Sequence, residues 1–490
     1  MSTSTHISPI GPVHPVAAPA PARASSYSLA VPQGAQRALA RGWLWLGLLA
    51  LIGAGLFSVL LVLSRTPGLN QWLPVADFFR VALVVHVDLS VLVWFVALAG
   101  LLWSLNGSAR GMAWGWAALA LCSAGTALMS LAPFLARAEP VMANYIPVLD
   151  GPLFIAGLLV FGVGATLLVL RSLFTAPKIG LSFDGEGALR FGLNAAAVSA
   201  AVALAAFAAS YARVPTTLAG SAYYEILFWG GGHALQFTWT LLMLVGWLWL
   251  ASACGAQVPL SPRVTVLMLA LALIAVFVTP YAYLAHDIAS VEHRNLLTWA
   301  MRVGGGLAIA PISLAVVVAL AHAPATRRHD HGPAAPLDSH GPAAPLRAAL
   351  LSSVLLFAAG GLIGVFIAGS NVRIPAHYHG CIVGVTLALM GLVFHLLPRL
   401  GYGTPQGRLA TLQPWLYGAG QLMHIVGLVW SGGYGVQRKV AGAEQVLRSG
   451  GEVAGMALMG LGGAIAIVGG LLFVAVVIRS LRQTTLSGHP

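Results

Sequence analysis

The chain has 490 residues, of which 58% are hydrophobic and 8% are charged. A soluble protein of this length needs a far more charged surface, so the composition excludes a soluble globular protein and predicts an integral membrane protein. The formal net charge of +12 comes from basic residues that gather on one side of the apolar segments. This charge therefore sets the orientation in a membrane and does not predict a nucleic-acid partner.

Apolar segments long enough to cross a bilayer follow one another through most of the chain. They predict an all-α integral membrane protein, a bundle of twelve transmembrane helices embedded in membrane lipid. The expected spans lie near residues 43–64, 79–104, 112–135, 150–172, 188–212, 224–251, 263–285, 295–321, 347–369, 377–398, 412–431 and 454–479.

Polar segments frame this domain, which is expected to cover residues 42–482. Residues 1–41, rich in Pro, Ala and Ser, predict a disordered tail, and residues 483–490 predict a second one. A Pro/His-rich linker at 323–346 repeats HGPAAPL and predicts a solvated loop. The distribution of Lys and Arg places both termini in the cytoplasm, so the protein is expected in the inner membrane of a bacterium.

Five intramembrane histidines fall at one depth in this topology, in the outer part of the bilayer. They are His86, His233, His286, His377 and His379. A shared layer of cofactors explains this grouping, because an imidazole in lipid is costly and marks function. His395, at the inner end of its span, does not join the layer, and His424, midway along another span, is expected to contact a neighbouring helix only.

His377 and His379 stand two residues apart at the start of the tenth span. Positions i and i+2 lie about 200° apart around a helix, so the two imidazoles point to opposite sides. One helix can therefore supply ligands to two separate centres.

This pattern resembles the main subunit of the haem-copper oxidase superfamily, which has twelve helices, two haems and a histidine-ligated metal. The resemblance implies that His86 and His379 are the axial ligands of a low-spin haem. It also implies that His377 is the proximal ligand of a high-spin haem, and both haems are expected to be of b type.

The resemblance extends to the surroundings of the haems. His233 and His286 resemble ligands of the metal beside the high-spin haem. Arg438 and Lys439, in the loop after span 11, resemble the basic pair that binds haem propionates, since adjacent cations suit carboxylates.

The metal ligands depart from the pattern of the superfamily. Most members have two consecutive histidines at the end of helix 7, whereas here Asp287 follows His286. With His233 this gives two histidines and one carboxylate, a set that favours non-haem iron, with copper as the alternative. His293 or Glu292 is an alternative third ligand.

Two further departures concern the tyrosine expected near the metal ligands and the route by which protons reach the site. Phe237 stands one turn after His233, where many oxygen-reducing members carry a tyrosine, and Tyr281 and Tyr283 on helix 7 keep an alternative phenol open. The carboxylates within the spans lie toward the outer ends. Glu225, two turns outward from His233, is therefore expected to relay protons from outside, with Asp150 or Asp287 as further relay groups.

The favoured function is a membrane redox enzyme resembling the nitric oxide reductase branch. The alternative is a terminal oxygen reductase that pumps protons, and a third class is a haem-binding sensor, assembly factor or transporter without turnover. The substrate is thus NO or O2. The three cysteines form no motif for covalent haem or thiolate copper. Electrons are therefore expected from a partner subunit, a cytochrome c, a cupredoxin or a quinol.

Overall fold

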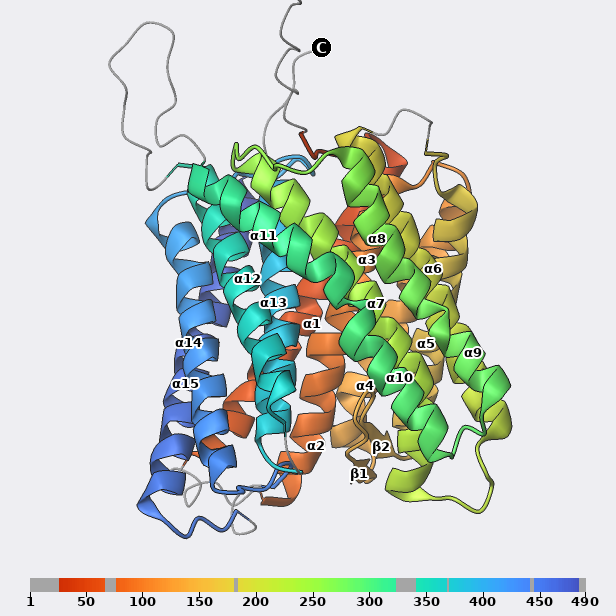
Figure 1. The fold of residues 1–490 in the computed structure, drawn as a ribbon, viewed down its shortest axis with the longest axis vertical. Coiled ribbons are helices and arrows are strands. Elements are labelled where there is room, and N and C mark those ends of the chain that lie inside the picture. The colour runs from red at the N-terminus through yellow and green to blue at the C-terminus, as the bar shows by residue number, and fades with distance from the viewer. Residues whose placement is uncertain are drawn as a thin grey trace, which may run out of the picture.

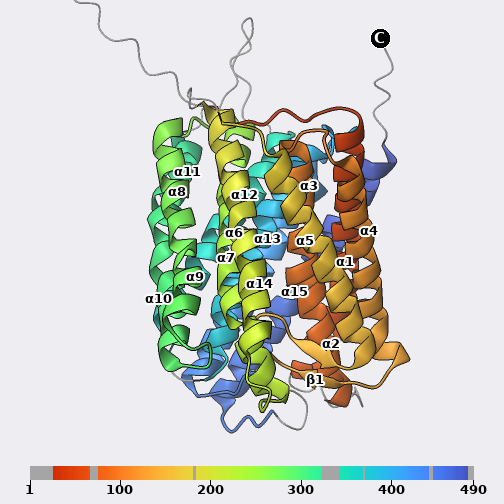
Figure 2. The same cartoon turned by 90° about the vertical axis from the view of Figure 1, so that its right-hand side faces the viewer.

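The computed structural model describes residues 26–66, 76–179, 184–322, 341–367, 370–440 and 445–483. Its long helices run side by side in one bundle (Figure 1; Figure 2). The first half of the chain forms α1 (Ala35–Arg65), α2 (Ala76–Val87), the π-helix η2 (Asp88–Val93), α3 (Trp94–Asn106), α4 (Met112–Leu135), β1 (Glu139–Val141), β2 (Val148–Asp150), α5 (Pro152–Thr175), α6 (Gly185–Arg213) and α7 (Gly220–Ala253). The second half forms α8 (Pro262–Val276), α9 (Val278–Ala285), α10 (Val291–Gly304), α11 (Gly306–His322), α12 (Ala343–Val365), α13 (Arg373–Leu396), α14 (Arg408–Gly433) and α15 (Gly450–Arg482).

The predicted membrane bundle is confirmed. Among the described residues, eleven helical units are long and apolar enough to cross a membrane. Three of these units are composite: α2, η2 and α3 form one, α8 and α9 another, and α10 and α11 a third. The expected span at 412–431, the eleventh in chain order, coincides with α14, which is not among these eleven units, carries more polar side chains and packs against α12, α13 and α15.

The chain ahead of the first span is more ordered than predicted. Helix α1 begins at Ala35, within the tail expected at residues 1–41. Tyr27 is fully buried, its backbone N–H donates to Ser252 Oγ at 2.9 Å, and its hydroxyl donates to Leu260 O at 2.8 Å. Residues 26–41 are therefore packed on the bundle, and the remainder of that tail lies outside the described residues. The expected linker and C-terminal tail also fall largely outside the described residues, and α12 already begins at Ala343.

A short β-hairpin joins α4 to α5, and the sequence analysis did not predict it. Strands β1 and β2 pair antiparallel, with Glu139 opposite Asp150. The hairpin contacts α2 and α7 at one end of the bundle, here called the hairpin end (Figure 2). By the predicted topology this is the outer side.

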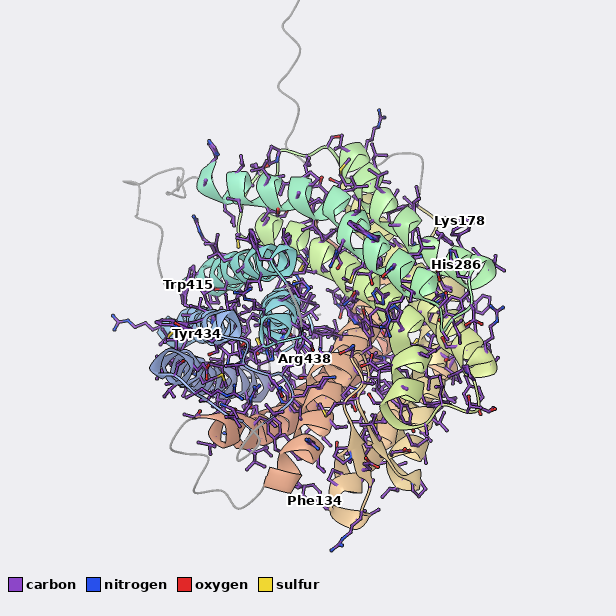
Figure 3. All side chains as sticks on the ribbon, turned by 60° about the horizontal axis from the view of Figure 1, so that its bottom comes forward. Phe134, Lys178, His286, Trp415, Tyr434 and Arg438 are labelled. Carbon is purple, nitrogen blue, oxygen red and sulfur yellow. The ribbon has the colours of Figure 1, made fainter. Side chains whose placement is uncertain are left out.

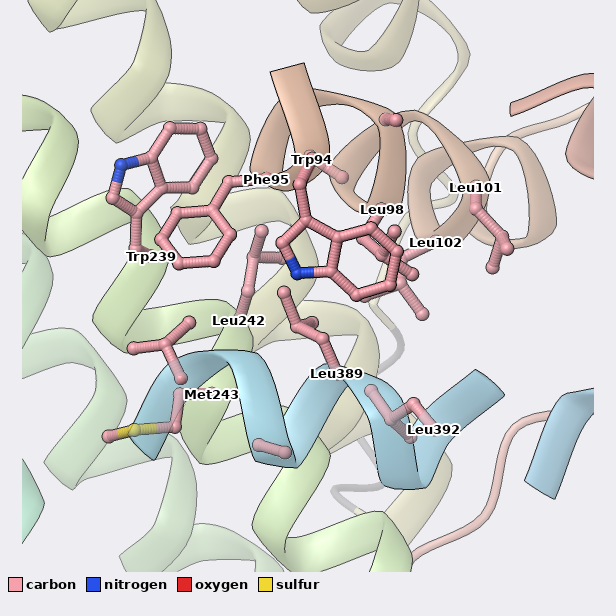
Figure 4. Close-up of a cluster of buried hydrophobic side chains, with 14 of the residues drawn as sticks. Trp94, Phe95, Leu98, Leu101, Leu102, Trp239, Leu242, Met243, Leu389 and Leu392 are labelled. Atoms are coloured by element: carbon pink, nitrogen blue, oxygen red, sulfur yellow. The ribbon is translucent and has the colours of Figure 1, made fainter. Parts of the chain in front are cut away.

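Helices α7 and α13 form the centre of the bundle. Of their most apolar windows, 78% and 83% of residues are buried, more than in any other described span. Aromatic and aliphatic side chains of α3, α7 and α13 interlock between them (Figure 4): Trp94, Phe95, Trp239, Leu242, Met243, Leu389 and Leu392. Because α7 and α13 also carry His233, His377 and His379, this packing fixes the helices on which the site is built.

Candidate haem and metal sites

His86 and His379 lie on helices that face the same region toward the hairpin end. His86 occupies the last turn of α2, and its ring Nδ1 lies 2.9 Å from Ala54 O on α1. When Nδ1–H donates to this carbonyl, Nε2 presents its lone pair, which is the usual arrangement of a metal-ligating histidine. His86 and His424 both interact electrostatically with His379, so three imidazoles surround one region.

His424 is the member of this region that the sequence analysis set aside. Its ring lies 5.1 Å from the ring of His379, and its Nδ1 lies 3.0 Å from Met459 O on α15. The carbonyl bond holds His424 against His379. Its place midway along a span, outside any motif, gave no signal of this neighbour.

Arg65, at the end of α1, completes the region, and the sequence analysis missed it as well. Its Nε and one terminal nitrogen are buried and have no hydrogen-bond partner among the described residues. The guanidinium interacts electrostatically with His379 and His424. A buried cation with free N–H groups suits a carboxylate such as a haem propionate. With two imidazoles available as axial ligands, these residues fit a haem.

A π-helix follows directly after His86. This segment, η2, has the π-helical geometry, which is rare and often occurs at functional sites. It begins with Asp88, which is 1% exposed and whose two carboxylate oxygens have no partner among the described residues. The turn thus places a buried carboxyl group next to the helix of the haem ligand.

His377 faces away from this region, toward α12. Its Nδ1 lies 2.7 Å from Gly360 O, which leaves Nε2 available for iron. A methyl group on Gly364 would lie 2.6 Å from the same Nδ1, so the glycines of α12 make room for the ring. His379 packs instead on α14 through His424. The two histidines of α13 therefore face different helices, as two separate haems require.

His233 lies on α7 and is 3% exposed. Its Nδ1 lies 2.8 Å from Trp229 O one turn earlier, and its Nε2 lies 3.1 Å from the hydroxyl of Tyr145 in the hairpin loop. Gly232 permits this contact, because a methyl group at that position would overlap the Tyr145 ring. Both nitrogens of His233 are thus hydrogen-bonded.

The predicted ligand set of His233, His286 and Asp287 is not assembled in this structure. Helix α9 ends at Ala285, and His286 is already extended, with φ −136° and ψ 151°, so it leaves the helical face expected for it. Asp287 is exposed, and its carboxylate accepts the N–H of Ala289 at 2.8 Å. In the view with the hairpin end turned toward the reader, His286 lies at the edge of the bundle (Figure 3).

His293 is the histidine that the structure places with His233. It lies on α10, is 2% exposed, and interacts electrostatically with His233. Its Nδ1 lies 3.3 Å from Ala282 O, while Glu292 beside it is exposed. Across the described part of the chain, however, no three His, Cys, Asp or Glu side chains gather to hold a metal ion. The residues present therefore do not fit the non-haem metal as predicted.

The two tyrosines of α9 differ in their surroundings. Tyr281 is 59% exposed on the apolar surface of the bundle. Tyr283 is buried, and its hydroxyl lies 2.6 Å from Ser210 Oγ while its ring meets the edge of His293 at 4.8 Å. Neither hydroxyl is the partner of a His233 nitrogen, because these nitrogens face Trp229 O and the Tyr145 hydroxyl.

Glu225, Arg438 and Lys439 meet at the hairpin end through Asn144. The Asn144 amide donates to Glu225 Oε2 at 2.9 Å and accepts from Arg438 at 3.2 Å. Lys439 donates to the Met142 carbonyl and approaches Asn144 Oδ1 at 3.5 Å. Burial, and then the charge of Arg438, lower the pKa of Lys439 to about 8, which the carboxylate of Glu225 partly offsets. Figure 3 shows Arg438 near the middle of the bundle, beside α13.

A central helix pair whose histidines face separate regions, with Arg65, Arg438 and Lys439 toward the hairpin end, suits a membrane-embedded redox protein. The chain matches the family described as Cytochrome C and Quinol oxidase polypeptide I over residues 38–472, and it belongs to that family. It is thus a main subunit of the haem-copper oxidase superfamily. Membership implies a membrane oxidoreductase with haem cofactors, a metal centre, a redox substrate and an electron donor.

The relatives extend over most of the chain. An uncharacterized protein of Rickettsia prowazekii (strain Madrid E) is 30% identical over 498 aligned positions, which cover 89% of this chain and 94% of that protein. An uncharacterized protein of Aquifex aeolicus (strain VF5) is 27% identical over 76% of this chain and 88% of its own length. A solved haem-copper terminal oxidase dimer superposes with a TM-score of 0.66 at 16% identity, covering 93% of this chain and 86% of that one.

Proposed function

We propose that this protein reduces nitric oxide: two NO, two electrons and two protons give N2O and water. The haems, when bound, would carry the electrons and bind the nitrogen oxide. His86 and His379 would hold the low-spin haem, and His377 the high-spin haem. The Nδ1 contacts of His86 and His377 leave Nε2 available, and His377 and His379 face different helices. Arg65, Arg438 and Lys439 would anchor propionates.

One observation carries the choice of NO, namely the polar chain that leads from the hairpin end to His233. Glu225 lies eight residues, or about 12 Å, toward that end from His233 on the same helix. Its carboxylate is bonded to Asn144, and the adjacent Tyr145 is bonded to His233. The opposite half of α7, residues 238–253, contains no Asp, Glu or Lys. Glu225 would therefore hold protons drawn from the outer side, and the hairpin end is proposed to face outward.

The predicted metal set contributes no step, because His286 and Asp287 lie apart from His233. The rings of His233 and Trp229 lie with their centroids 4.7 Å apart, and Arg294 lies over Trp229 with its guanidinium carbon 5.0 Å from the ring centroid. We propose that the rings of His233 and Trp229 border the site where the nitrogen oxide binds.

The test compares Glu225→Gln with Glu139→Gln, an exposed carboxylate on the same hairpin end. NO turnover should fall in Glu225→Gln by about tenfold or more while both haem spectra remain, since loss of a proton relay typically costs 10²–10⁴. Glu139→Gln should match wild type. Equal turnover in both variants would remove Glu225 from the mechanism.

Oxygen reduction is the second candidate, and one contact favours it. Oxygen reductases of the superfamily use a phenol beside the metal-site histidine, and Tyr145 lies 3.1 Å from His233. Rapid O2 turnover with protons taken from the side opposite the hairpin end would support this candidate.

A further inference from the structure

His233 has no phenol one turn further along its own helix, because Phe237 occupies that position of α7. The tyrosines of α9 lie elsewhere, since Tyr281 is exposed and the Tyr283 hydroxyl lies 2.6 Å from Ser210 Oγ. A phenol reaches His233 from an element that the sequence did not predict, the loop between β1 and β2. Tyr145 places its hydroxyl 3.1 Å from Nε2, with the two ring centroids 4.9 Å apart.

The hairpin loop is held on both sides of this contact. Asn144, the preceding residue, bonds both Glu225 and Arg438. At the far end of β2, Asp150 accepts the hydroxyl of Tyr224 at 2.9 Å. The position of Tyr145 is therefore fixed by the bundle and does not depend on the tyrosine alone.

The surface of α7 is shaped for aromatic rings. Three consecutive glycines precede His233, and each lies against a different ring: Gly230 against Tyr283, Gly231 against Phe207 and Gly232 against Tyr145. Packing alone would be satisfied by a phenylalanine at position 145. The hydroxyl aimed at the histidine is the feature that packing leaves unexplained.

The direction of the hydrogen bond between Tyr145 and His233 follows from the partner of the other ring nitrogen of His233. His233 Nδ1 lies 2.8 Å from a carbonyl, which can only accept, so Nδ1 carries the proton of the neutral ring. Nε2 is then the acceptor and the Tyr145 hydroxyl the donor. A phenol has an ordinary pKa of about 10, so the hydroxyl carries a proton to donate at neutral pH.

We propose that Tyr145 is the active-site phenol of this protein and the positioning residue for His233, supplied by the β1–β2 hairpin because position 237, one turn after His233 on α7, is a phenylalanine. Its O–H bond fixes the tautomer and ring plane of His233. Its neighbour in the chain, Asn144, bonds Glu225, so the hairpin loop brings both side chains to this part of α7. This role rests on the proposed function in one respect, that His233 borders the gas-binding pocket.

The experiment compares Tyr145→Phe with Tyr224→Phe in the full-length haem-loaded protein. Each change removes one hydroxyl that holds the hairpin, but only Tyr145 touches the histidine. Tyr145→Phe should lower turnover by about tenfold, the effect expected for one hydrogen bond in a catalytic pocket. It should also shift the C–O stretching frequency of the CO-bound ferrous haem, which reports polar groups facing the gas. Tyr224→Phe should stay within about twofold of wild type with an unshifted frequency.

A second pair keeps the test informative if Tyr145→Phe assembles poorly. Gly232→Ala places a methyl group where the Tyr145 ring lies and should reproduce both effects. Its control is Gly306→Ala, because a methyl group at that α11 position meets no atom within 4 Å. An unshifted frequency together with turnover within twofold of wild type, in Tyr145→Phe or in Gly232→Ala, would overturn the proposal.

The outcomes separate this inference from the choice of substrate. Both NO and O2 are assayed, so a protein that reduces only O2 defeats the proposed function while the comparison of Tyr145 with Tyr224 still decides the role of the phenol. Loss of turnover equal in Tyr145→Phe and Tyr224→Phe would assign the effect to the hairpin and overturn the role of the hydroxyl.

Discussion

Gly364→Ala tests whether His377, the proposed ligand of the high-spin haem, depends on its place against α12. The substitution leaves the histidine itself unchanged. The new methyl carbon would lie 2.6 Å from His377 Nδ1 and 2.7 Å from its Cε1. Carbon atoms in contact keep about 3.5 Å, so the ring must move by about 1 Å. The movement breaks the bond between Nδ1 and Gly360 O, which measures 2.7 Å.

The magnitude follows from these two effects. Overpacking in a well-packed interior costs about 1–3 kcal/mol, and the lost hydrogen bond adds about 0.5–1.5 kcal/mol. The affinity for the high-spin haem should therefore fall by about 10- to 1000-fold. The low-spin haem should remain, because His379 faces α14 and not α12.

The assay is haem content by pyridine haemochrome together with the CO difference spectrum, which reports the high-spin haem alone. Gly361→Ala is the matched control, since a methyl group at this adjacent position on α12 would meet no atom within 4 Å. If Gly364→Ala binds CO as fully as Gly361→Ala, the assignment of His377 to a haem seated against α12 is refuted.

Three further predictions concern the metal ligands, His424 and Lys439. His286→Ala and Asp287→Ala should leave the non-haem metal content and both haem spectra unchanged, because neither side chain reaches His233; loss of a stoichiometric metal in either variant would restore the predicted ligand set. His424→Ala should shift the midpoint potential and absorbance of the low-spin haem while haem content is retained, because its ring packs on His379 at 5.1 Å; an unchanged potential would return His424 to a helix-contact role. The pKa of Lys439 is lowered to about 8, so its positive charge is lost as the pH rises through 8. Loss of a positive charge near a haem favours the ferric state of its iron. The potential of the haem that Lys439 is proposed to anchor should thus fall between about pH 7 and 9. Lys439→Arg should abolish this dependence, and an identical slope in the variant would exclude Lys439 as the cause.

The spans and the two facings of α13 could be predicted from the sequence because both depend on helical periodicity. Uninterrupted apolar segments fix the helices, and the spacing of His377 and His379 fixes opposite sides whatever surrounds them. The remaining site depends on contacts between distant segments. Tyr145 sits in a loop between strands of three residues each, too short to leave an alternating pattern.

Helix ends explain why the predicted metal ligands His286 and Asp287 lie apart from His233. A difference of one or two residues in where α9 stops decides whether His286 continues its face, and sequence patterns do not resolve such boundaries. His424 and Arg65 carried no motif, and their roles emerge only from packing on His379. The sequence does carry one signal of this packing: the three glycines at 230–232 mark a helix surface that other groups approach closely.

The most direct test of NO reduction measures NO and O2 turnover on one preparation in proteoliposomes, with a pH indicator on each side of the membrane. We predict faster NO reduction, with protons taken up on the side that carries the β-hairpin and Glu225. Faster O2 reduction with protons taken up on the opposite side would contradict the proposed function.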